Sequence, residues 1–204
     1  LVPVDAEVAR LVEAAAAIFA DFGCVVERAC PDLSDAMAVF QIQRAAVLAV
    51  LGRTLEAEVP DWRAHAKPTA IWNIDRGLAL RSAELLDSEV RRTHIYRRAV
   101  AFFDRYDALL LPAAQVPAFP LEWDYVREIN GQPMDTYIDW MTICCAISVT
   151  GLPALSVPAG FTSTGLPVGL QMVAGPHDDL GLLQLAHEFE QATLHGRRRP
   201  ELAS

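Results

Sequence analysis

Lysine is almost absent from this acidic sequence, which narrows the functions that it can perform. A single lysine, Lys67, accompanies sixteen arginines, and the formal net charge is −9. An acidic chain repels the phosphate backbone of nucleic acids, so we expect no nucleic-acid partner. No apolar run reaches the roughly 18 residues that a membrane-spanning helix needs, so we expect no membrane partner.

Cysteine is also scarce, and no two cysteines form a Cys-x-x-Cys pair. The four are Cys24, Cys30 and the adjacent Cys144-Cys145. Because a disulfide framework is improbable with this pattern in a chain of 204 residues, we expect buried free thiols in a reducing compartment. Residues 1–5 show neither a basic region nor a cleavage site, so no secretory signal is expected. The interpretation that follows is a cytoplasmic location.

Sequence patterns of metal or cofactor sites are missing as well. His187-Glu188 begins like a zinc motif, but position 191 is Gln where HExxH needs His. Asp178-Asp179 is better explained as a helix cap than as a pair of catalytic carboxylates. We therefore expect no metal and no cofactor.

The N-terminal part of the chain predicts a helix followed by a strand. Apolar residues recur at helical spacing from Val8 to Phe22, after Asp5 as a capping residue and before Gly23 as a terminator. Residues 24–29 are rich in β-formers and end at Pro31. A helix joined to a strand by a minimal link is typical of α/β proteins.

The rest of the chain continues this α/β pattern. Residues 52–73 remain unassigned. Residues 154–160 and 167–174 predict two strands, which the turn residues Thr162-Ser-Thr-Gly165 connect as a hairpin. The other expected elements are helices over 35–51, 82–106 and 136–149, a buried strand over 108–112, a loop over 113–135 and a last helix after Asp178 or Asp179.

The run from Gly151 to Gly175 resembles the C-terminal signature of the amidase signature family. That family has GLPA-x-SVPAG, a turn and then GLPVGLQ, which residues 151–175 match almost continuously. The segment Ala99–Pro112 and the opening helix are also similar to family segments. The resemblance covers nearly the whole chain and implies one domain over 1–204, the C-terminal half of an amidase-like fold. The fold class implied is part of a three-layer α/β/α fold with a mixed sheet.

The resemblance also implies an activity whose catalytic groups are not expected here. Family members hydrolyse amides with a serine nucleophile, a second serine in a cis peptide and a lysine base. This chain contains neither a Ser-Ser nor a Gly-Gly pair, and Lys67 does not stand in the family's lysine context. We therefore expect the N-terminal catalytic core to be missing and the chain to be inactive alone, acting on a small-molecule amide only in the complete enzyme.

What the resemblance leaves to this chain is part of the substrate pocket. In the family, the helix before the GLPA segment lines the acyl channel. Transferred to this sequence, that implies the following substrate-binding candidates: Tyr137, Trp140, Met141, Cys144 and Ser148. Many family members carry Asn where this chain has Ser148, a departure that weakens any inference about polar contacts there. No catalytic residue is expected.

Two other functions stay open. The chain could be a non-catalytic binding or assembly module that kept the amidase scaffold, with the missing N-terminal half or a second copy as partner, because a partial sheet leaves open edges. It could also be an independent hydrolase using Ser156 or Cys145. No Gly-x-Ser-x-Gly elbow surrounds Ser156, which lies in an expected buried strand, so this reading is the weaker one.

Overall fold

The computed structural model describes residues 2–199, so Leu1 and residues 200–204 lie outside this account. Five helices come first along the chain, and strands and helices are mixed after them. In chain order the elements are α1 (Ala6–Asp21), α2 (Ala36–Glu58), α3 (Trp62–His65), α4 (Pro68–Leu78), α5 (Ser82–Phe102), β1 (Ala108–Pro112), β2 (Glu128–Ile129), β3 (Gln132–Pro133), the 3₁₀ turn η1 (Asp139–Met141), α6 (Thr142–Thr150), β4 (Ala154–Phe161), β5 (Pro167–Ala174), α7 (Asp179–Thr193) and the 3₁₀ turn η2 (His195–Arg197).

The main sheet has three described strands in the order β1-β5-β4, all antiparallel. The predicted hairpin of β4 and β5 is confirmed, with Gly165 at a φ of 85° in its turn. Pro158 pairs with Gly169 and Gly160 pairs with Val168, so one extra residue forms a β-bulge in β4. A proline fits there because an edge strand does not need every N–H for pairing.

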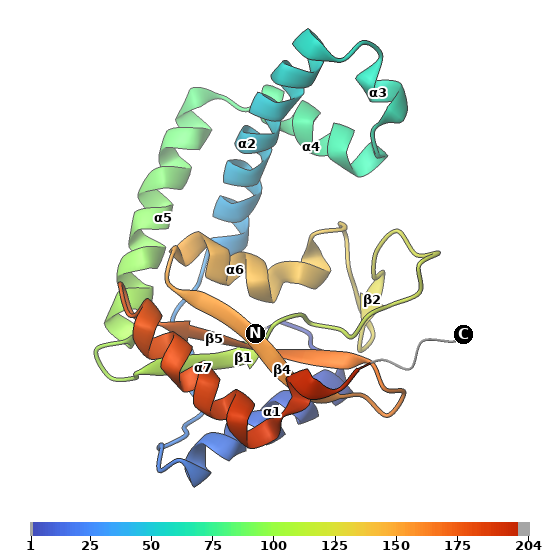
Figure 1. Cartoon of the computed structure of the whole chain (residues 1–204). Helices are drawn as coiled ribbons and strands as arrows, with labels where there is room; N and C mark the ends of the chain where they lie inside the picture. The colour runs from blue at the N-terminus through green and yellow to red at the C-terminus, as the bar shows by residue number, and fades with distance from the viewer. Residues whose placement is uncertain (1, 200–204) are drawn as a thin grey trace.

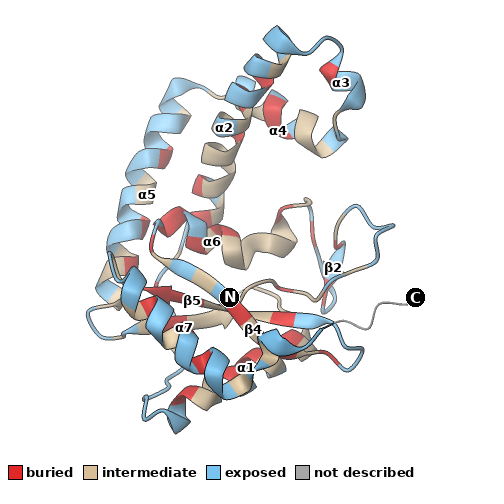
Figure 2. Cartoon of the chain, in the orientation of Figure 1, coloured by how far each residue is buried: buried red, intermediate tan, exposed pale blue. Residues whose placement is uncertain are grey.

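Helices cover both faces of this sheet, which confirms a layered α/β fold (Figure 1). On one face, Phe19 of α1 and Phe189 of α7 stack with ring centroids 5.2 Å apart over buried residues of β4 and β5. On the other face, Ala99 of α5 and Ile147 of α6 pack against Val173. Burial is concentrated along these two contacts, whereas the outer surfaces of α2 and α5 are exposed (Figure 2).

The first helix forms as predicted. The carboxylate of Asp5 accepts hydrogen bonds from the N–H groups of Glu7 and Val8, at 2.9 and 3.2 Å. At the other end, Gly23 adopts a φ of 86°, which a residue without a side chain tolerates. The cap at the last helix is also confirmed, since Asp178 accepts from the N–H of Gly181.

The strand predicted over residues 24–29 is wrong. The segment forms no regular secondary structure and belongs to neither described sheet. The expectation that all four cysteines are buried is also wrong, because Cys24 and Cys30 are exposed, Cys144 is half-buried and only Cys145 is buried. The strand is absent because β-forming residues make a strand only where a neighbouring strand pairs with them.

The helix predicted over 35–51 continues to Glu58, and the unassigned stretch after it is helical too. Gly52, the residue after the predicted end, is a packing position in α2. A Cβ on Gly52 would collide with Ile74 of α4, and one on Gly77 would collide with the backbone of Ala45. The two helices therefore approach closely because glycines stand at their contact. Val50 of α2 is exposed.

The helix predicted over 136–149 begins later than expected. The carboxylate of Asp139 accepts the N–H of Thr136 at 2.6 Å, which holds a turn ahead of η1. The loop over 113–135 contains a small β2–β3 hairpin that sequence reading missed. Its turn residues, Asn130 and Gly131, have φ values of 51° and 79°, as a type I′ turn requires.

By length and composition alone, α2 could cross a membrane, a test that core helices of soluble folds also pass. In this structure α2 packs against α4, α5 and α6. Val39 of α2, Ile95 of α5 and Val149 of α6 form one buried cluster. The helix is thus integrated into the helical layer of the fold.

Candidate functional site

The candidate pocket residues all lie on one segment, η1 and α6 with the turn before them. A buried glutamine fixes the start of α6. Gln115, which is 0% exposed, accepts the N–H of Ile143 at 3.1 Å and donates to the carbonyl of Pro3 at 2.9 Å. Because α6 leaves its first N–H groups without helical partners, this amide acts as a cap from a distant loop.

Tyr137 is tied to the helical pair α2–α4. Its hydroxyl oxygen accepts a hydrogen bond from Nη2 of Arg44 at 2.9 Å and a second, very short one from Nδ2 of Asn73. Asn73 is 1% exposed and also donates to the carbonyl of Thr69. Trp72 packs edge-on against the tyrosine ring, with centroids 6.4 Å apart. Tyr137 is therefore held from several sides.

Trp140 packs in a different direction, against the loop before α6. Its ring meets Phe119 edge-on with centroids 5.3 Å apart, beside the buried cluster of Val126, Ile129 and Met134. Its Nε1 is buried and has no hydrogen-bond partner among residues 2–199. A buried N–H without a partner is costly, so this donor is available to any acceptor that reaches it.

Met141, Cys144 and Ser148 are spaced three and four residues apart, which places them on one face of α6. The Cys144 thiol donates to the carbonyl of Met141 at 3.1 Å, and the Ser148 hydroxyl donates to the carbonyl of Cys144 at 2.9 Å. Ser148 is exposed and the other two are half-buried.

Interaction between the two adjacent thiols shifts the pKa values of Cys144 and Cys145 in opposite directions. The bond from Cys145 stabilises the Cys144 thiolate and lowers the pKa of Cys144 to about 7, aided by backbone N–H groups at the start of α6. The same bond and burial raise the pKa of Cys145. The contact of Cys144 with the Met141 carbonyl exists only for the protonated thiol, so ionisation exchanges one partner for another.

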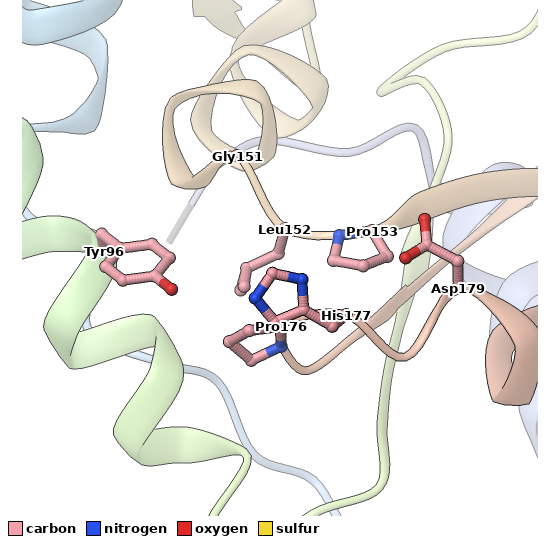
Figure 3. Close-up of a pocket in the computed structure, with 7 residues that line it drawn as sticks. All are labelled: Tyr96, Gly151, Leu152, Pro153, Pro176, His177 and Asp179. Atoms are coloured by element: carbon pink, nitrogen blue, oxygen red, sulfur yellow. The ribbon is translucent and has the colours of Figure 1, made fainter.

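The structure thus brings Met141, Cys144 and Ser148 together, while Tyr137 and Trp140 anchor the segment to different neighbours. Two open hollows lie elsewhere, at the carboxyl end of α6. The larger, of about 340 Å³, is bounded by Tyr96, Gly151 and His177 (Figure 3). The smaller, of about 250 Å³, adjoins Arg92 of α5. None of the five candidate residues lines either hollow.

Neither candidate nucleophile is activated by a base in the described structure. Ser156 lies in β4 as predicted, but the expectation that it is buried is wrong, because its side chain is on the opposite face of the strand from the buried Val157 and Ala159 and is exposed. Among residues 2–199, no histidine or lysine is a hydrogen-bond partner of Ser156 or Cys145. Lys67 is exposed at the start of α4. No group of three potential metal ligands occurs in the described part of the chain.

Arg44, Asn73 and Gln115 are the site residues that sequence reasoning missed. Asn73 lies in the unassigned stretch 52–73 and Gln115 in a region read as loop, so neither had a periodic pattern to mark it. Arg44 interrupts the apolar helix α2, and a charge at a semi-buried helix position was the one available signal.

Three arginines of α5 make contacts with other elements of the chain. On α5, Arg91 pairs with Asp35 at 3.0 Å and Arg98 pairs with Asp32 at 3.1 Å. Between them, Nε of Arg92 donates to the carbonyl of Val149 at the end of α6. These bonds attach α5 to the start of α2 and to α6.

Comparison with known proteins assigns the chain to a family. Residues 1–183 match the family described as Amidase. A glutamyl-tRNA(Gln) amidotransferase subunit from Synechococcus sp. (strain CC9605) is 32% identical over 98% of this chain. The same subunit from Moorella thermoacetica is 46% identical over 54% of it. The chain belongs to the amidase family.

Solved structures agree at the level of fold. A bacterial aryl acylamidase of the amidase signature enzymes superposes with a TM-score of 0.85 at 24% identity over 98% of this chain. The 6-aminohexanoate cyclic dimer hydrolase superposes with a TM-score of 0.80 at 22% identity. The chain spans 44% of each of these two chains, 44% of the Synechococcus sp. relative and 21% of the Moorella thermoacetica relative. It is therefore a partial amidase-signature fold.

Proposed function

We propose that this chain is the C-terminal part of an amidase that hydrolyses the C–N bond of a non-peptide carboxylic amide. In this proposal residues 1–204 form one domain that supplies scaffold and a wall of the substrate pocket, in the cytoplasm. The serine nucleophile and its base belong to the part of the fold that this chain does not span. The observation that supports this proposal most is that 98% of this chain matches only 44% of the aryl acylamidase chain.

The geometry of the α6 segment supports the pocket-wall role. The segment before and along α6 carries two aromatic, two sulfur-containing and one hydroxyl side chain: Tyr137, Trp140, Met141, Cys144 and Ser148. Gln115, Arg44 and Asn73 hold this segment by hydrogen bonds from three other elements or loops. A wall fixed in this way is pre-organised, which favours ligand binding because little order is lost on association.

Reconstitution of hydrolysis tests this proposal. The probe is the portion of the Synechococcus sp. relative that this chain does not match, produced as a separate polypeptide. We expect no turnover of 4-nitroacetanilide or of glutamine by either polypeptide alone, and release of 4-nitroaniline or ammonia on mixing. The anilide is chosen because one structural neighbour is an aryl acylamidase, and glutamine because the relatives are amidotransferase subunits.

Two variants make the assay specific. Trp140→Ala should raise KM more than it lowers kcat, because it removes pocket surface and leaves the catalytic groups in place. Lys67→Met, at an exposed position, should leave both constants unchanged if the base lies outside this chain. Hydrolysis by the unmixed chain, abolished by Lys67→Met, would contradict the proposal.

A non-catalytic assembly module is the second candidate, and one observation favours it. Apolar side chains stand exposed on several elements of the described structure, among them Val47 of α2 and Trp72 of α4. A protein surface of this kind is typical of an interaction site. An assembly role without catalysis predicts that the mixture forms a stable complex but hydrolyses neither substrate.

A further inference from the structure

The link between α1 and α2 contains β-forming residues but pairs with no described strand (Figure 1). Residues 24–29 form neither helix nor strand, and Val25 and Val26 are 88% and 45% exposed. The N–H of Cys24 donates to the carbonyl of Phe19, but within residues 2–199 no backbone hydrogen bond involves Val25 to Ala29. Consecutive unpaired N–H and C=O groups beside β-branched side chains form a template for β-pairing.

Side-chain contacts at the middle of the link fix its position. Glu27 accepts hydrogen bonds from Nη2 of Arg105 at 2.9 Å and from the hydroxyl of Tyr106 at 3.0 Å. Arg28 pairs with Glu13 of α1 at 2.7 Å. Because these contacts restrict the backbone before any partner arrives, less entropy is lost when a strand adds to it.

The same contacts place the link beside a second open edge. Tyr106 lies two residues before β1, and among the described strands β1 pairs only with β5. The other edge of β1 is therefore free in the described structure. Two unpaired stretches of backbone thus occur near one another at the α5–β1 corner.

We propose that residues 24–29 are the docking strand for the part of the amidase fold that this chain does not span, by addition of a β-strand. The inference rests on the proposed function for the identity of the partner. In the matched aryl acylamidase, one polypeptide contains both the part that resembles this chain and a larger remainder, since the match covers 44% of that chain. A second copy of this chain would repeat the same helices and strands and would not supply the rest.

Hydrogen–deuterium exchange of the full chain tests the docking strand. In the chain alone, the amides of residues 25–29 should exchange almost as fast as in an unstructured peptide. With the complementary portion of the Synechococcus sp. relative added, they should slow by at least about tenfold, as paired strand amides do. Unchanged exchange in a complex detected by light scattering would overturn the proposal.

A proline variant separates pairing from folding. Val26→Pro removes one unpaired N–H donor, so it should weaken complex formation by at least about tenfold while the melting temperature of the chain alone stays constant. Ala118→Pro, in an exposed loop, is the matched control and should leave complex formation unchanged. Equal binding by both variants would overturn the proposal that residues 24–29 are the docking strand.

The outcomes distinguish this inference from the proposed function. Hydrolysis on mixing that is indifferent to Val26→Pro would keep the amidase proposal and reject the docking strand. Complex formation that depends on Val26 without any hydrolysis would keep the docking strand and reject the catalytic proposal. Protection of residues 25–29 that rises with the concentration of the chain alone would identify a second copy as the occupant and overturn the proposal.

Discussion

At the scale of single residues, the candidate site is defined by polar side chains that connect distant segments. Gln115 joins the N-terminal segment to α6, and Asn73 with Arg44 joins α4 and α2 to Tyr137. Each is a bond between parts of the chain that are far apart in sequence. Such residues carry no local pattern, which is why the sequence predicts the helices but not what holds them in place.

The Gln115→Leu substitution should destabilise the chain more than an average surface change. It would strand the N–H of Ile143 and the carbonyl of Pro3 without partners, and each buried unsatisfied group costs about 1–3 kcal/mol. We expect a loss of about 2–4 kcal/mol in the free energy of unfolding, measured by urea denaturation. Gln184→Leu, exposed on α7, is the control, and an equal effect of the two would contradict the role of Gln115.

The thiol of Cys144 should react with iodoacetamide with a midpoint near pH 7. Its lowered pKa means that the reactive thiolate is the minor form below that pH and dominates above it. Cys145, buried and with a raised pKa, should remain unlabelled over the same range. Peptide mass spectrometry from about pH 5.5 to 9 measures both.

Cys145→Ala should move the Cys144 midpoint upward, because the substitution removes the thiol donor that stabilises the thiolate. A midpoint that stays near pH 7 would show that the start of α6, and not Cys145, stabilises the Cys144 thiolate.

At the scale of elements, the helical pair α2–α4 carries the contacts that position Tyr137. Gly77 stands where α4 meets the backbone of α2 at Ala45. A side chain cannot fit there unless the helices separate. The pair is therefore a rigid support for the turn before α6, although it lies outside the sheet (Figure 1).

Gly77→Ala should push α4 away from α2 and disturb Tyr137 indirectly. Overpacking of this kind costs about 1–3 kcal/mol, and the displacement should weaken the hydrogen bond between Asn73 and Tyr137. We expect a lower melting temperature together with a changed near-ultraviolet circular dichroism signal from the Trp72–Tyr137 contact. Gly196→Ala is the control, since a Cβ there meets only the tip of Glu190 at 3.9 Å. Wild-type behaviour of Gly77→Ala would contradict the close approach.

The sequence predicts elements whose signals are local and fails where the deciding contact is remote. The hairpin β4–β5 and the cap at Asp5 follow from turn and capping residues that lie within a few positions of each other. The strand predicted at residues 24–29 is wrong because a strand needs a partner. The helix predicted to end at residue 51 continues through Gly52, which packs against Ile74. For the candidate site, the helix is predictable but the direction of each side chain is not.

At the scale of the whole molecule, the described chain is a layered α/β unit with open edges. Its two helical layers close both faces of the sheet, yet β1 and β4 each lack a neighbour on one side within residues 2–199. The match to 44% of the structural neighbours explains these edges as places where the rest of the family fold would continue. Catalysis, in this account, is a property of the completed sheet and not of the chain alone.

A serine-directed fluorophosphonate probe locates the catalytic nucleophile most directly. The chain is incubated with a fluorophosphonate, alone and mixed with the complementary portion of the Synechococcus sp. relative, and the labelled peptide is identified by mass spectrometry. The account predicts no stoichiometric label on this chain in either case, and a labelled serine on the complementary portion in the mixture. Stoichiometric labelling of Ser156 in the chain alone would contradict it.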